Sequence, residues 1–415
     1  MDYISLLQKE MRPAFGCTEP IALAYAAAKA ASVLDEFPNH IHARCSANII
    51  KNVKSVVIPN SGGRKGLAAA TVLGAIVGHP ERELEVLESA TDEDRKWLGT
   101  ILEANFCTVE LAEGVDNLYI EITATTDEHT AVVRIENAHT NITYVSIDEN
   151  VISETVNEIK EAESSTCPMT FDSIYEFAKA GDISGILPSI KQQVEYNTAI
   201  SNEGLSNDYG ANIGRLLLLD DETPSLETKC KARAAAGSDA RMSGCPLPVV
   251  ICSGSGNQGL TVSMPIITTA EELDKTDEEL YRSLVFANLL TLYVKSGIGK
   301  LSAYCGVVSA GIVSVAGIAF LKGDSKSIIE DTLVNGLVSL SGIVCDGAKP
   351  SCAGKIAISL DGAFMGYKQA RLNKSYQKGD GLVAHSVDDT IKSIGVVAQG
   401  MKETDVVILN EMLKH

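Results

Sequence analysis

The sequence predicts an α+β protein with a large, mainly helical domain and a smaller module that contains an antiparallel sheet. Apolar and polar residues alternate between residues 107 and 147, which predicts strands with one polar face. The chain after residue 164 instead carries long apolar segments separated by glycine-rich loops, a pattern typical of packed helices. A length of 415 residues suits two or three domains. We place these at 1–38, 39–163 and 164–415.

Residues 1–38 predict a pair of helices that pack on the large domain, with a break between Pro13 and Pro20. The segment HARCSANIIKNVKSVVIP, just after Ile41, is predicted to form one or two strands. The alanine-rich segment GLAAATVLGAIVG and the polar segment PERELEVLESATDEDRKWL each predict a helix. The strands of the sheet follow in TVELAE, LYIEITATT, TAVVRIEN and ITYVSID, which short polar turns join into a meander. The acidic segment NEIKEAESS then forms a linker.

One uncharged stretch in the helical part, LSAYCGVVSAGIVSVAGIAFL, is long enough to span a bilayer, which takes roughly 20 residues. Serine and glycine residues throughout it lower its hydrophobicity. Small residues also allow neighbouring helices to approach closely. We therefore expect a buried core helix and no membrane association.

The charge composition argues against some classes of binding partner. Lys and Arg total 35 against 54 Asp and Glu, a net charge of −19 that repels nucleic acids and anionic membranes. The first residues, MDYISLLQKEMRP, lack the apolar core of a signal peptide. Ten cysteines in a chain of this length are few compared with small disulfide-rich secreted domains. We expect a cytoplasmic protein with reduced cysteines.

A glycine-rich loop, GSGNQG at residues 254–259, matches the pattern of a dinucleotide-binding turn. Such a turn must open a helix, and the β-branched segment LTVSMPIIT with Pro265 argues against a helix there. We therefore expect no NAD. The loop can instead offer backbone N–H groups, with Ser253, Ser255 and Asn257, to a small anion such as a carboxylate, or it can be a structural turn.

The cysteines divide by context. Cys45, Cys107 and Cys230 lie in apolar segments and read as buried hydrophobic residues, and Cys167 has no informative neighbours. Two pairs have six residues between their members. These pairs are Cys245 with Cys252, and Cys345 with Cys352.

The second of these pairs, in CDGAKPSC, lies in a loop between two predicted helices, which can bring both thiols onto one metal. Cys352 would lie near a helix N-terminus, where the helix dipole favours a thiolate. The candidate for a third ligand is Cys305, which lies on the glycine-rich helix. Three thiolates without a nearby histidine suit an iron–sulfur cluster better than zinc. Such a cluster keeps one iron without a protein ligand, and that iron is a Lewis acid.

Cys17 lies in GCTEP, just before a predicted helix. A thiolate at this position could act as a base. Cys17 could equally be a buried thiol near a helix start that Thr18 or Glu19 caps.

Five segments carry a resemblance along nearly the whole chain. In order, GCTEPIALAYA, PNSGGRKGLAAA, SGSGNQG, AYCGVVSAG and CDGAKPSCAGKIA resemble the L-cysteine desulfidase family, which is related to the alpha chain of iron–sulfur L-serine dehydratases. The resemblance implies a 4Fe–4S cluster on Cys305, Cys345 and Cys352, with Cys17 as the base. The spacing of the last two ligands is nearer to that of the desulfidases than to that of the dehydratases.

The resemblance also implies an activity, the elimination of sulfide from L-cysteine to give pyruvate, ammonia and sulfide. Neither PLP nor NAD is expected. We expect the substrate carboxylate to be received among Ser253, Ser255, Asn257, Asn60 and Arg64. One alternative is L-serine dehydratase activity at the same site, and another is a non-enzymatic amino-acid-binding or regulatory protein. The glycine-rich helices would also suit the interface of a homodimer.

Overall fold

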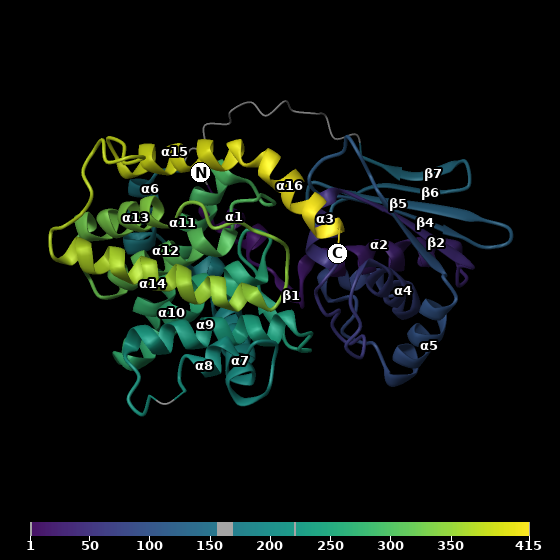
Figure 1. The fold of residues 1–415 in the computed structure, drawn as a ribbon, viewed down its shortest axis with the longest axis horizontal. Coiled ribbons are helices and arrows are strands. Elements are labelled where there is room, and N and C mark those ends of the chain that lie inside the picture. Colours follow the sequence, from purple (N-terminus) through teal and green to yellow (C-terminus); the bar gives the residue numbers. More distant parts are fainter. Residues whose placement is uncertain (1, 156–168, 220, 415) are drawn as a thin grey trace.

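The computed structural model describes residues 2–155, 169–219 and 221–414. It confirms an α+β fold with two parts (Figure 1). The N-terminal part, purple to blue, contains the large sheet, and the C-terminal part, teal to yellow, is mainly helical. The predicted linker, its boundary at 163/164 and Cys167 lie outside the described residues.

The sheet has six strands in the order β3-β2-β4-β5-β6-β7. The strands span His40–Cys45 (β2), Cys107–Leu111 (β3), Tyr119–Thr125 (β4), Thr130–Glu136 (β5), Ile142–Ile147 (β6) and Asn150–Glu154 (β7). Strands β4, β5 and β6 pair antiparallel in chain order, which confirms this part of the predicted meander, and β2 and β7 pair antiparallel on either side of them. The edge strand β3 differs, because it pairs parallel to β2. The intervening helices carry the chain back across the sheet, as a parallel pair requires.

Two local predictions in this part are wrong. The segment predicted to form one or two strands contains β2, but its residues 47–53 form helix α3 (Ala47–Val53). The helix is only seven residues long, and its β-branched residues Ile49, Ile50 and Val53 are typical of a strand, so the short segment mimics one. The predicted polar helix divides into a 3-10 turn at Pro80–Glu85 and α5 (Asp92–Glu103). A capping box between Thr91 and Asp94 begins α5 anew.

The two N-terminal helices belong to different parts. Helix α1 (Tyr3–Glu10) contacts α11 (Asp277–Ile298) of the helical part. Helix α2 (Thr18–Leu34) lies against β4, β5 and α4 (Leu67–Val77). Between α1 and α2, strand β1 (Pro13–Phe15) pairs antiparallel with β8 (Pro248–Val250). The start of the chain therefore connects both parts.

The helical part is built around α12 (Gly306–Leu321), which confirms the predicted core helix. It packs against α10 (Gly256–Glu272), α11, α13 (Lys326–Leu340) and α14 (Ser351–Arg371). At Gly317 a Cβ would lie only 2.6 Å from Ile266 Cδ1, so glycine permits the close approach of α10. In the described part of the chain, no helix is long and apolar enough to cross a membrane. The remaining helices are α6 (Phe171–Ala180), η2 (Ser184–Ile186), α7 (Leu187–Ser206), α8 (Ile213–Leu216), α9 (Leu226–Met242), α15 (Val387–Gly400) and α16 (Lys402–Leu413).

Helix α10 corrects the prediction that no helix follows the glycine-rich loop. It begins at Gly256 and continues through Pro265. Hydroxyl side chains within it donate to backbone carbonyls one turn earlier, as Thr261 does to Asn257 and Thr269 to Pro265. Because α10 is almost wholly buried, tertiary packing outweighs the weak helix propensity of its sequence. The strand before the loop, β8, pairs antiparallel with β1 and so lacks the parallel arrangement of a dinucleotide fold.

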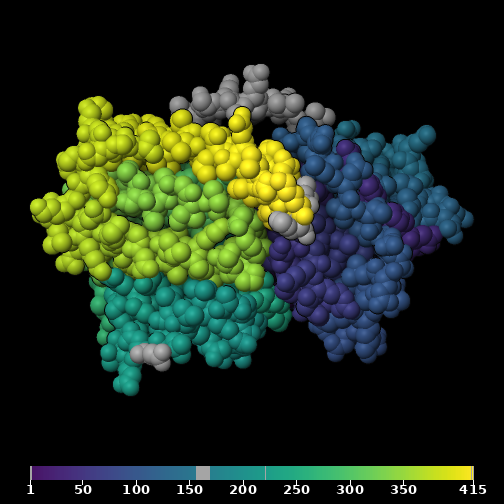
Figure 2. Space-filling model, in the orientation of Figure 1, coloured from purple at the N-terminus to yellow at the C-terminus, as the bar shows by residue number. Residues whose placement is uncertain are grey.

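The last helix reaches from the helical part to the N-terminal part. Asp405 of α16 forms a buried ion pair with Lys51 of α3, and Lys54 Nζ donates to the carbonyl of Met412 at 2.6 Å. Figure 2 shows this yellow segment at the boundary with the purple and blue surface.

Candidate active site

A small cavity of about 90 Å³ lies where the two parts meet. All four cysteines singled out from the sequence line it, namely Cys17, Cys305, Cys345 and Cys352. Ser255 and Asn257 of the glycine-rich loop also line it. The structure thus brings together residues from opposite ends of the chain.

Two of the three proposed cluster ligands are joined by a short antiparallel bridge. The N–H of Cys305 donates to the carbonyl of Ile343 at 3.1 Å, and the N–H of Cys345 donates to the carbonyl of Ala303 at 2.6 Å. Cys305 is the N-cap residue of α12, just before its first turn, so the bridge anchors the helix start to the loop. The thiols of Cys305 and Cys345 contact each other.

Cys352 lies in the first turn of α14, as the sequence predicted. Its thiol faces the carbonyl of Gly347 at 3.6 Å. Gly347 has a φ of +93°, and a Cβ there would lie 2.4 Å from the carbonyl oxygen of Lys51. Only glycine therefore lets the loop that carries Cys345 and Cys352 pack directly against α3.

The three thiols differ in acidity. The hydrogen bond from Cys305, together with the charge of Lys51, lowers the pKa of Cys345 to about 6 despite burial. That same hydrogen bond, with burial, raises the pKa of Cys305, and burial raises the pKa of Cys352. Cys345 is therefore the thiol most readily converted to the thiolate that metal binding requires.

The donor set consists of three thiols, the ligand type that holds an iron–sulfur cluster. In residues 2–155, 169–219 and 221–414, no group of three or more His, Cys, Asp or Glu side chains is already arranged to hold a metal ion. Lys295 also lines the cavity and is buried, with no ion pair among the described residues. Burial lowers its pKa to about 8, against the charges of Cys345 and Cys305. A buried ammonium needs a nearby negative charge, which a thiolate-bound cluster would provide.

Cys17 faces the same cavity from the N-terminal part. It is the N-cap residue of α2 and is only 3% exposed. Its thiol donates to Glu19 Oε2 at 3.2 Å. The carboxylate is held in turn by Asn52 Nδ2 at 3.0 Å and Thr18 Oγ1 at 3.1 Å, with His139 Nε2 at 3.9 Å. Cys17 therefore belongs to a buried polar network.

This network changes the expected acidity of Cys17. Burial and the negative charge of Glu19 raise the pKa of the thiol well above its usual value, and the charge of Arg241 opposes them. Burial would also raise the pKa of Glu19, but His139 and the Cys17 thiol outweigh it and lower the pKa to about 2. In this network Cys17 is therefore a thiol beside a carboxylate, not the thiolate expected from the helix dipole alone.

Several cavity residues were not named from the sequence, among them His139, Arg241, Lys51 and Lys295. His139 comes from the turn between β5 and β6, Arg241 from the end of α9, and Lys51 from α3. No local motif marks any of them, because each reaches the cavity only through the tertiary fold. The one available signal in the sequence was the presence of single lysines, Lys51 and Lys295, among apolar residues, because a buried lysine can indicate a site.

The predicted carboxylate-binding residues do not all lie together. Ser255 caps α10 by accepting the N–H of Gln258, and Asn257 Oδ1 accepts from Arg241 Nη1 at 3.1 Å. Ser253 is buried but does not line the cavity. Asn60 and Arg64 are also absent from its walls: Asn60 donates to the carbonyl of Leu87, and Arg64 donates to the carbonyl of Ser61. The last two side chains hold their own loop in place.

The remaining described cysteines lie outside the cavity. Cys45, Cys230, Cys245 and Cys252 are buried, and Cys107 is half-buried on β3. For Cys45, Cys230 and Cys252, burial is consistent with the predicted role as core residues.

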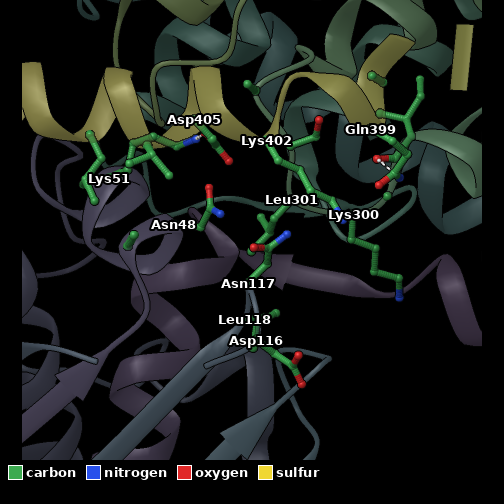
Figure 3. Close-up of a pocket in the computed structure, with 18 of the residues that line it drawn as sticks. Asn48, Lys51, Asp116, Asn117, Leu118, Lys300, Leu301, Gln399, Lys402 and Asp405 are labelled. Atoms are coloured by element: carbon green, nitrogen blue, oxygen red, sulfur yellow. Dashed lines mark hydrogen bonds and ion pairs between the residues drawn. The ribbon is translucent and has the colours of Figure 1, made fainter. Parts of the chain in front are cut away.

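A larger cavity of about 610 Å³ adjoins this site (Figure 3). The two cavities share Asn48, Lys51, Lys300, Leu301 and Ser302. Figure 3 shows Lys402 and Asp405 on the yellow α16 above this space, with Asn117 and Leu118 on the opposite side. The larger cavity thus lies between α16 and the sheet-bearing part.

Known relatives match this sequence over nearly its full length. A UPF0597 protein of Finegoldia magna is 46% identical over 417 residues, covering 100% of this chain and 99% of the relative. The chain belongs to the UPF0597 family. UPF0597 proteins of Desulfitobacterium hafniense and Lachnoclostridium phytofermentans are 45% and 44% identical, and each alignment covers at least 96% of both chains.

The family model of the serine dehydratase alpha chain matches residues 81–410 of this UPF0597 family member. The matched range contains His139, Arg241 and the three clustered cysteines, and it begins after Cys17. The match indicates an enzyme of the dehydratase or lyase type.

Proposed function

We propose that the protein is a non-redox iron–sulfur lyase that eliminates sulfide from L-cysteine, giving pyruvate, ammonia and sulfide. One observation carries the proposal: Cys17 of the N-terminal part and Cys305, Cys345 and Cys352 of the helical part line one small cavity. The serine dehydratase alpha-chain match supports the reaction class. The resemblance of the five sequence segments supports cysteine as the substrate.

Cys305, Cys345 and Cys352 would hold the cluster. When bound, a 4Fe–4S cluster on three thiolates supplies an iron that can act as a Lewis acid. Lys295 offsets negative charge on that side of the cavity, and Lys51 holds the loop through its hydrogen bond to the carbonyl of Cys345 at 3.5 Å. The protein itself thus supplies the ligands, their charge balance and the packing that fixes the loop.

Cys17 is proposed to take the proton from the substrate Cα. In the resting site the thiol donates to Glu19, so it must lose this proton before it can act as a base. The elimination then breaks the Cα–H and Cβ–S bonds, with the electron pair of the C–H bond forming the Cα–Cβ double bond and the sulfur leaving as sulfide. Water converts the released aminoacrylate to pyruvate and ammonia. No net oxidation or reduction occurs.

The direct test is anaerobic reconstitution with iron and sulfide, followed by an assay with L-cysteine. Sulfide and pyruvate are expected in equal amounts, and a protein treated with a chelator is expected to form neither. Cluster-loaded protein that forms no pyruvate from L-cysteine would contradict the proposal. If it also binds the amino acid, a non-enzymatic binding role is favoured.

L-serine dehydratase activity is a second candidate, favoured by the family model that matches residues 81–410. The same cavity would then release water in place of sulfide. The ratio of kcat/KM for L-cysteine to that for L-serine decides between the two. A higher value for L-serine would replace the proposed substrate and keep the same ligands and base.

Glu19→Gln is expected to move the rising limb of the kcat/KM profile to lower pH. The Glu19 carboxylate disfavours the Cys17 thiolate and therefore raises the thiol pKa, so its removal lowers that pKa. The other titratable or charged side chains at this network, Arg241 and His139, are unchanged in this variant. Activity should then persist to lower pH than in the wild type.

The matched control is Glu330→Gln, a half-buried carboxylate on α13 outside the cavity, which should leave the profile unchanged. If the pH dependence of kcat/KM in Glu19→Gln is the same as in the wild type, Glu19 does not control the ionisation of the base.

A further inference from the structure

Arg241, near the end of α9, is a buried cation without an anionic partner. It is only 2% exposed and lines the cavity together with Cys17. Nη1 donates to Asn257 Oδ1, and Nε has no hydrogen-bond partner. Among the described residues no carboxylate forms an ion pair with it. The nearest acid on α9, Asp239, instead accepts the backbone N–H of Gly214 at 3.0 Å.

Such an arrangement is costly unless an anion binds. A guanidinium keeps its charge even when buried, and one neutral amide oxygen satisfies only one of its five N–H groups. Breaking or omitting the partner of a buried charge destabilises a protein substantially. Arg241 therefore points to an anionic ligand in the cavity.

The surroundings of Arg241 also favour an anion. A Cβ on Gly256 would lie 2.3 Å from Arg241 Nε, so glycine at the start of α10 is what lets the guanidinium pack there. Helix α10 is seventeen residues long, and the first N–H groups of such a helix favour negative charge. The Arg241 guanidinium and the N-terminus of α10 thus favour an anion at the same place.

The other cavity cations have different roles. Lys51 is paired with Asp405, and Lys300 is paired with Glu10 at 2.9 Å. Lys295 interacts with the charges of Cys345 and Cys305, on the proposed cluster side. Arg241 instead acts on Cys17, whose pKa its charge lowers. The unpaired guanidinium is therefore the cation that lies beside the proposed base.

This position matches the chemistry of an α-amino acid. The carboxylate is bonded directly to Cα, the atom that loses its proton. A group that holds the carboxylate beside Cys17 therefore also holds the Cα–H beside the base.

We propose that Arg241 binds the α-carboxylate of the substrate, so that the site accepts free α-amino acids and discriminates against esters and amides of them. This inference rests on the proposed function for the identity of the reaction, but its binding component does not require turnover. Arg241 would be a substrate-binding residue, with Asn257 positioning its guanidinium through the 3.1 Å hydrogen bond.

The test uses cluster-loaded wild type, Arg241→Gln and Arg241→Lys. We compare kcat/KM for L-cysteine and for L-cysteine methyl ester. In Arg241→Gln the value for L-cysteine is expected to fall about 100-fold, with little change for the ester, because a charge-assisted hydrogen bond is lost. Arg241→Lys should recover part of the loss, since the charge returns without the bidentate geometry.

A second readout is independent of turnover. L-Alanine, which has no leaving group, should raise the Tm of the wild type, and L-alaninamide should not. Arg241→Gln should lose the response to alanine. The matched control is Arg233→Gln on the same helix, where Arg233 pairs with Glu271 outside the cavity. This control should keep both the alanine response and the preference for the free acid.

The outcomes separate the two proposals. If wild type turns over L-cysteine and Arg241→Gln keeps the acid-to-ester preference and the alanine response, the inference on Arg241 is wrong and the proposed function stands. If alanine stabilises the wild type but not Arg241→Gln, and no pyruvate forms from cysteine, the carboxylate site stands and the lyase proposal fails. Should Arg241→Gln not fold, Arg241→Lys with an unreduced preference for the free acid and a full alanine response would overturn the inference.

Discussion

Alanine in place of Cys345 is expected to give a folded protein that cannot retain iron and forms no pyruvate above background. Two thiols would remain at a site where three are needed, and the lost thiol is the one whose pKa is lowered to about 6. Even residues that only support a metal ligand cost about 10- to 100-fold in metal affinity when changed, so the loss of a ligand should cost more. Iron content per chain and the visible absorbance of anaerobically reconstituted protein measure the effect.

Cys305→Ala and Cys352→Ala should behave in the same way, since both thiols line the same cavity. Cys107→Ala is the matched control, because Cys107 lies on β3 away from the cavity and should keep the iron. Full iron content in all three cavity variants would show that these cysteines are not the ligands.

The second large effect is expected for Cys17→Ser, which should keep the cluster and bind L-cysteine but lose about 10²- to 10⁴-fold in kcat. A hydroxyl is far less acidic than a thiol and cannot serve as a base near neutral pH. Serine is nearly isosteric, so the donor to Glu19 is preserved and the buried network should remain intact. Iron content, substrate-induced change in the visible spectrum and steady-state rates separate these effects.

Cys107→Ser is again the control and should retain wild-type rates. A Cys17→Ser protein with wild-type kcat would exclude Cys17 as the base and leave the cluster assignment untouched.

Much of the fold could be predicted because its pattern is local. Strict alternation marked the strands between residues 107 and 147, and the small-residue segment of α12 was correctly assigned to the core. The predictions failed where burial removes periodicity. Helix α3 buries polar as well as apolar side chains, and α10 contains Pro265 in a buried helix whose hydroxyl groups bond to the backbone.

The candidate site was accessible from the sequence only where chemistry is concentrated in a motif. Cys17 with Glu19, and Cys345 with Cys352, are close in sequence and could be recognised. His139 and Arg241 could not, because a turn of the sheet and the end of a distant helix carry no local signature of the cavity. Asn60 and Arg64 resembled binding residues, but their hydrogen bonds serve the loop that contains them.

The placement of the cavity between the two parts has a consequence for the biogenesis of the protein. The proposed base, Cys17, is translated before the loop that contains Cys345 and Cys352. A nascent chain can fold around Cys17 while the opposite wall does not yet exist. For the proposed cluster, iron would then be delivered after translation of Cys352 at the start of α14, either before the two parts dock or through the larger adjoining cavity.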